Sequence, residues 1–179
     1  MLGTMVDSLT PDTKDWTWVL DRPCPECGFD ARNLAREDVA GMLRRNAAAW
    51  PAVLGTDATR RPRPDKWSPL EYACHVRDVC RVYAERLHLM RTQDDPHYPN
   101  WDQDATAVRD RYADQDPPAV AEELLAAAAA LADAFDQVTD WTRTGNRGDG
   151  AHFTIETFAR YLIHDPVHHL YDVTGTRAT

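Results

Sequence analysis

Residues 67–75, Trp-Ser-Pro-Leu-Glu-Tyr-Ala-Cys-His, decide the fold that we expect for this chain. Ser68 stands where a helix N-cap is needed, Pro69 occupies the first helical position, and Glu71 completes a capping box. Apolar side chains recur at helical spacing in the sequence that follows. The stretch therefore predicts the start of a long amphipathic helix with His75 on or beside its core-facing stripe.

Three further segments show the same periodicity and have start and stop signals at their ends. The four expected helices cover residues 37–54, 68–92, 117–138 and 154–175. The connection over residues 93–116 is longer than the roughly two to eight residues that usually join antiparallel helices, so we expect a crossover with a short helix near 102–112. The predicted fold is all-α, a four-helix bundle with a long crossover between helices 2 and 3.

Length and composition restrict the class of protein. A chain of 179 residues with 43% hydrophobic residues can form one domain, here 1–179, with an N-terminal extension over 1–35 and the bundle over 36–175. We find no apolar run long enough to cross a membrane and no basic segment followed by an apolar one, which favours a cytoplasmic protein. The net charge of −9 argues against a nucleic-acid partner and leaves a small molecule as the expected one.

Three histidines form the candidate site. His164 and His168 are four residues apart, so both imidazoles can lie on one face of the fourth helix. His75 supplies a third imidazole from the second helix. Three neutral imidazoles with an open position for water are typical of a catalytic metal site, and they favour Zn²⁺ or a similar ion such as Ni²⁺. A core histidine with a hydrogen-bond partner is the alternative for each of them.

The neighbours of this histidine pair are expected to lie on another face. Asp165 and His169 are rotated by about 100° from His164 and His168 if the helix is regular. Pro166 lacks a backbone N–H and can bend the helix, which would alter that expectation.

Cys24 and Cys27, with Gly28 after them, form the knuckle of half a zinc site. Cys74 and Cys80 are poor partners for it, because six residues on a helix place them on different faces. The knuckle can borrow a histidine such as His152, form a redox-active pair or simply make a turn. We favour the turn and assign no metal to the two cysteines.

The sequence resembles the DinB-like superfamily of metal-binding four-helix bundles. The resemblance rests on W-S-x-x-E-x-x-x-H ending at His75 and on H-x-x-x-H from His164 to His168. It implies a metal triad of one histidine from the second helix and either two histidines, or a carboxylate and a histidine, from the fourth. Carried over to this chain, the triad is His75, His164 and His168.

The resemblance also implies a function, since members of the family include mycothiol- and bacillithiol-dependent S-transferases. We therefore expect a metal-dependent enzyme that uses a low-molecular-weight thiol such as mycothiol on a small electrophile. Asp78, one turn after His75, and Arg160, one turn before His164, are the candidate catalytic residues. A metal-dependent hydrolase, a non-catalytic metal-binding stress-response bundle and a metal-free interaction protein remain alternatives, and a homodimer is plausible for this family.

Overall fold

The structure is a computed structural model that describes residues 15–178, so the predicted extension is described from residue 15 onward. The helices of this part, with the short 3-10 turns labelled η, are η1 (Thr17–Leu20), η2 (Ala31–Asn33), η3 (Arg36–Asp38), α1 (Val39–Val53), α2 (Pro69–Thr92), α3 (Gln103–Arg109), η4 (Tyr112–Asp114), α4 (Pro117–Asp136) and α5 (Ile155–Thr174). The four long helices confirm the predicted bundle.

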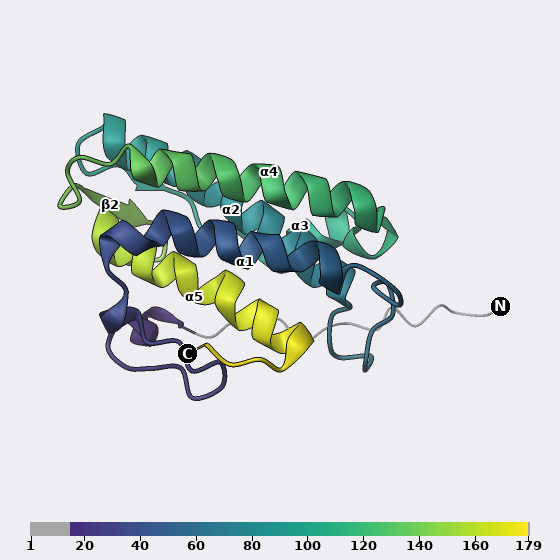
Figure 1. Cartoon of the computed structure of the whole chain (residues 1–179). Coiled ribbons are helices and arrows are strands. Elements are labelled where there is room, and N and C mark those ends of the chain that lie inside the picture. Colours follow the sequence, from purple (N-terminus) through teal and green to yellow (C-terminus); the bar gives the residue numbers. More distant parts are fainter. Residues whose placement is uncertain (1–14, 179) are drawn as a thin grey trace.

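The long helices form a ring in which each contacts two neighbours. α4 packs against α1 and α2, and α5 packs against the same two helices from the other side (Figure 1). The core between them is apolar and aromatic, with Trp50, Leu87, Leu124, Phe135 and Phe158 almost completely buried. This arrangement brings α5 next to the face of α2 that contains His75.

The start of α2 has the predicted capping box. The Ser68 hydroxyl accepts a hydrogen bond from the Glu71 backbone N–H, and the Glu71 carboxylate accepts one from the Ser68 N–H. These bonds satisfy two of the backbone groups that a helix leaves without partners at its N-terminus. The local signal in residues 67–75 therefore fixes where α2 begins.

The crossover between α2 and α4 contains the predicted short helix, α3, followed by η4. A small sheet was not predicted: β1 (His97–Tyr98) pairs parallel to β2 (Thr144–Arg147), which pairs antiparallel to β3 (His152–Thr154). The strands are only two to four residues long and mostly polar, so they lack the alternation that announces a strand. The sheet joins the crossover to the segment before α5.

The described N-terminal segment, residues 15–38, lies along α5, and η1 and η2 contact that helix (Figure 1). The C-terminal tail lies against the same segment, because the Ala178 N–H donates to the Cys27 carbonyl at 2.7 Å. Arg177 adds a hydrogen bond to the Pro25 carbonyl. The last helix is thus packed between the bundle and the N-terminal segment.

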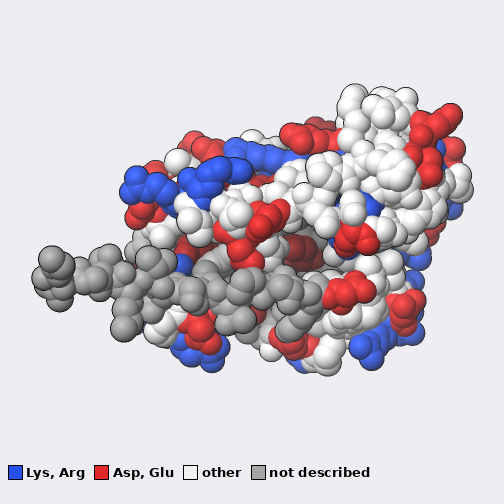
Figure 2. Space-filling model, turned by 180° about the vertical axis from the view of Figure 1, so that it is seen from behind, with Lys and Arg blue, Asp and Glu red and all other residues white. Residues whose placement is uncertain are grey.

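No helix within residues 15–178 combines the length and the apolar character that a membrane span requires. In Figure 2, acidic and basic side chains both appear on the described surface, and several basic ones lie side by side at the upper left of the view.

Candidate metal centre

The chemistry of the site comes from six consecutive residues of α5, His164-Asp165-Pro166-Val167-His168-His169. The helix continues through Pro166, whose carbonyl accepts a hydrogen bond from the Asn46 side chain of α1 at 2.9 Å. The segment therefore presents two pairs at i,i+4 spacing on neighbouring faces, His164 with His168 and Asp165 with His169.

The second of these pairs faces α2 and meets His75. The His75 Nε2 atom lies 3.2 Å from Asp165 Oδ2, and His169 Nε2 lies 3.8 Å from the same oxygen. One ligand atom from each of the three residues can be chosen so that all lie within 4.8 Å of one another. We call His75, Asp165 and His169 the α2–α5 group.

The α2–α5 group fits a divalent ion. Within residues 15–178, His75 Nδ1 and Asp165 Oδ1 are buried and have no hydrogen-bond partner. An unsatisfied buried polar atom costs about 1–3 kcal/mol, so two of them within one group of side chains indicate that a ligand binds there. Two imidazoles and a carboxylate are a donor set of catalytic metal sites, which leave one position open.

Neighbouring side chains hold these three residues in place. The Asp172 carboxylate lies 3.0 Å from His169 Nδ1, which leaves His169 Nε2 directed at the group. The Trp101 ring stacks on His75 with centroids 5.4 Å apart. Burial would raise the pKa of Asp165, but His75 and His169 hold it well below its usual range. Asp165 is therefore a carboxylate, the form that binds a cation.

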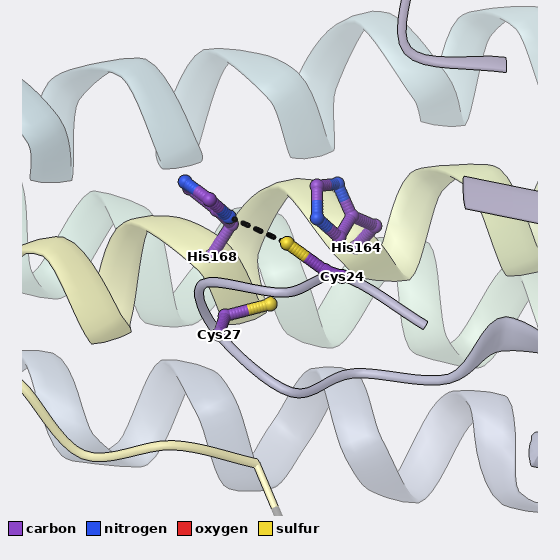
Figure 3. A group of neighbouring side chains, drawn as sticks. All are labelled: Cys24, Cys27, His164 and His168. Atoms are coloured by element: carbon purple, nitrogen blue, oxygen red, sulfur yellow. Dashed lines mark hydrogen bonds between the residues drawn. The ribbon is translucent and has the colours of Figure 1, made fainter. Parts of the chain in front are cut away.

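The other pair of α5 faces the N-terminal segment. His164 and His168 lie beside Cys24 and Cys27, and the four ligand atoms again lie within 4.8 Å of one another (Figure 3). Cys24 Sγ is 3.6 Å from His168 Nδ1. Burial lowers the pKa of His164 to about 4 and raises the pKa of Cys27 to about 12. We call these four residues the Cys–His group.

The structure thus divides the predicted triad. His75 lies with Asp165 and His169, whereas His164 and His168 lie with the two cysteines. The ligand set of His75, His164 and His168 stays a prediction, and the grouping of side chains favours two sites. Sequence reasoning placed Asp165 and His169 correctly on a separate face but did not assign them as ligands. The sequence did contain a signal for these two residues. Asp165 and His169 form a second i,i+4 pair, and the family triad can take a carboxylate and a histidine from the fourth helix.

The knuckle forms a turn, as expected, and it also has neighbours that the sequence did not indicate. Its two thiols are 0–2% exposed and meet histidines 140 residues later in the chain, which local sequence does not reveal. The proposed partner His152 is elsewhere: it is exposed, and its Nε2 lies 3.3 Å from Asp95.

The two candidate catalytic residues lie away from these groups. Asp78 is buried and accepts hydrogen bonds from Arg77 and Arg81 of α2 and from the Tyr112 hydroxyl of η4. Arg160 donates to the Leu34 carbonyl and pairs with Glu156. Neither residue lines the cavity that opens beside the α2–α5 group. Their contacts are those of structural residues, and their catalytic roles stay predictions.

A cavity of about 590 Å³ opens beside the α2–α5 group. Asp165 and His169 contribute to its wall, as do His164 and His168. The remaining lining combines aromatic, cationic and anionic side chains: Trp16, Tyr83, Arg86, Trp101, Asp102, Asp104, Arg147, Asp149 and Tyr161, with a few uncharged residues. Its volume is within the range of small-molecule sites, and the charges suit a polar ligand.

Fold and site together define a four-helix bundle whose second and last long helices contribute histidine and carboxylate side chains to one candidate metal centre. The chain belongs to the DinB superfamily, whose family model matches residues 42–173. A solved structure, YfiT from Bacillus subtilis, is similar in fold with a TM-score of 0.70 and 18% identity, over 78% of this chain and 84% of YfiT. YfiT is described as a probable metal-dependent hydrolase with an unusual four-helix bundle topology. The comparison with curated proteins found no match.

Proposed function

We propose that this protein is a metal-dependent enzyme whose catalytic ion is held by His75, Asp165 and His169. The proposal rests on one observation. His75 and Asp165 each have a buried atom without a hydrogen-bond partner among residues 15–178, and they lie together with His169 beside a cavity. When bound, a divalent ion such as Zn²⁺ or Ni²⁺ would lower the pKa of a thiol or a water molecule beside it.

The cavity residues supply binding and orientation. Arg147 is held by Asp149 and donates to the Tyr161 hydroxyl at 3.0 Å, so its guanidinium has a fixed position in the wall. Arg86 is buried over the Tyr83 ring at 5.2 Å. Fixed cations and aromatic faces bind polar molecules at a low cost in side-chain entropy.

For the reaction we favour transfer of a low-molecular-weight thiol to a small electrophile. This choice rests on the family resemblance and on the mixed polar and aromatic lining, which suits a hydroxyl-rich thiol such as mycothiol. Hydrolysis is the second candidate, and the description of YfiT favours it. The two reactions differ in whether thiol or water is the nucleophile.

Turnover assays with the Zn²⁺- or Ni²⁺-loaded protein separate these reactions. We expect mycothiol to react with 1-chloro-2,4-dinitrobenzene at a rate that saturates in mycothiol and falls at least about 100-fold in Asp165→Asn. The exposed Asp133, which pairs with Arg44 on the surface, provides the control Asp133→Asn with unchanged rate. Thiol-independent cleavage of p-nitrophenyl acetate that Asp165→Asn abolishes would instead support a hydrolase. If the native protein catalyses neither reaction faster than the Asp165→Asn variant does, the enzymatic proposal is wrong.

A further inference from the structure

The cysteine knuckle has the backbone of a metal-binding turn. The Gly28 N–H donates to the Cys24 carbonyl at 2.9 Å, and the Cys24 N–H donates to the Phe29 carbonyl at 2.8 Å. Gly28 has a φ of +82°, a conformation that side chains with a Cβ rarely adopt. The turn brings both thiols to the same side, next to α5 (Figure 3).

The four residues of the Cys–His group are all buried, with at most 8% of their surface exposed. Cys24 and Cys27 are not paired in a disulfide, and within residues 15–178 the buried His164 Nε2 atom has no hydrogen-bond partner. An inert core cluster would leave that nitrogen unsatisfied. The aromatic rings of Trp16, Trp18 and Phe29 lie around His164, with centroids 5.4, 6.4 and 6.2 Å from it.

The spacing of the group agrees with a tetrahedral zinc site. Zn–S bonds of about 2.3 Å and Zn–N bonds of about 2.0–2.1 Å place neighbouring ligand atoms roughly 3.3–3.8 Å apart. Cys24 Sγ and His168 Nδ1 are already 3.6 Å apart, and the widest separation in the group is at most 4.8 Å. Closing on an ion therefore requires shifts of about 1 Å or less.

We propose that Cys24, Cys27, His164 and His168 form a structural Cys₂His₂ zinc site that fastens the N-terminal segment to α5. Two thiolates and two neutral imidazoles around Zn²⁺ give a complex with no net charge, which suits a buried location, and its formation releases two thiol protons. All four positions are filled by the protein, as in structural rather than catalytic zinc sites.

This site differs from the proposed catalytic one in its ligands and in its origin. The two groups share no residue, because α5 gives one i,i+4 pair to each. Both cysteines precede residue 42, where the match to the family model begins, so half of the ligands lie outside the matched region. The described N-terminal segment contains only 3-10 turns of three or four residues. A metal cross-link would therefore stabilise the position of this segment on α5.

X-ray absorption at the zinc edge tests the site on the full-length protein purified with zinc and a reductant. In an Asp165→Asn/His169→Asn variant, which lacks two ligands of the other group, we expect one zinc per chain with two sulfur neighbours at about 2.3 Å. The native protein should show the same Zn–S distance, with about one sulfur neighbour per zinc on average when the α2–α5 group also holds zinc. The test therefore does not depend on whether a variant folds. Zinc with only nitrogen and oxygen neighbours, no bound zinc, or a Cys24–Cys27 disulfide would each overturn the proposal.

Cysteine variants complete the test. Cys24→Ser/Cys27→Ser should lose the sulfur signal and one zinc per chain. Cys74→Ser/Cys80→Ser removes two buried cysteines of α2 that are outside the group, and it should keep both. A sulfur signal that survives in Cys24→Ser/Cys27→Ser contradicts the site. A persistent sulfur signal in a protein that catalyses neither thiol transfer nor hydrolysis would leave this site in place and reject only the catalytic proposal.

Discussion

Glu71 shows how one side chain serves both local structure and stability. Its carboxylate accepts hydrogen bonds from the Ser68 N–H and from Arg61, which approaches from the loop before α2. Burial raises the pKa of Glu71, but these hydrogen bonds outweigh burial and hold the pKa below its ordinary value of 4.5. The ionised carboxylate therefore stabilises the folded state.

We expect Glu71→Gln to lower the free energy of unfolding by about 1–2 kcal/mol at pH 7, because the ion pair with Arg61 is lost. A lowered folded-state pKa stabilises the protein above the unfolded pKa and ceases to do so as pH falls through the folded value. The difference between native protein and variant should thus shrink below about pH 4.5. Urea denaturation at several pH values measures it, with the exposed Glu122→Gln as control; a pH-independent difference would refute the ionic role.

At the site, the triad of His75, His164 and His168 stays a prediction, and the structure places these histidines in two different groups of side chains. The helical spacing places His164 and His168 on one face, and the structure keeps them together. Which face of α5 meets His75 depends on how α5 is rotated against α2, and that rotation is set by packing of the whole core. The spacing of residues along a helix gives the angle between two residue pairs around the helix axis. It does not say which other part of the protein each pair contacts.

At the scale of elements, the small sheet depends on close packing that only the structure reveals. Gly145 lies in the middle of β2, and a Cβ built there would be 2.7 Å from Met90 Cγ and 3.0 Å from the Tyr98 ring. Both neighbours are buried, so neither can move freely. The strand can approach the end of α2 because this position has no side chain.

Gly145→Ala should therefore lower the free energy of unfolding by about 1–3 kcal/mol, the usual cost of overpacking. Gly55→Ala is the matched control, since a Cβ there makes only an ordinary contact 3.4 Å from the Ala52 carbonyl. Chemical denaturation of both variants measures the two effects. Equal stability of Gly145→Ala and the native protein would mean that β2 does not pack against Met90 as described.

The long helices were predictable because their signals are local, namely the capping box at Ser68, the proline positions and the apolar spacing. The strands were not predictable, since β1 and β2 are joined by hydrogen bonds between residues about 50 positions apart, such as Asn146 N–H to the Pro96 carbonyl. Short polar segments acquire their structure from such pairing.

For the whole molecule, α5 lies between the rest of the bundle and the N-terminal segment. One face closes the bundle against α2 with the α2–α5 group, and the neighbouring face contacts the N-terminal segment through the Cys–His group (Figures 1 and 3). The chain length, the number of expected helices and the long crossover predicted the bundle. The packing of the N-terminal segment against the last helix was not predicted, because it is a long-range contact without a local sequence signal.

The most direct test of the metal-dependent function is the metal content of the protein after removal of loosely bound ions. We expect the Asp165→Asn/His169→Asn variant to hold one metal ion per chain fewer than the native protein, with unchanged helical content by circular dichroism. Elemental analysis that finds the same metal content in both proteins would contradict the assignment of His75, Asp165 and His169 as the catalytic ligands.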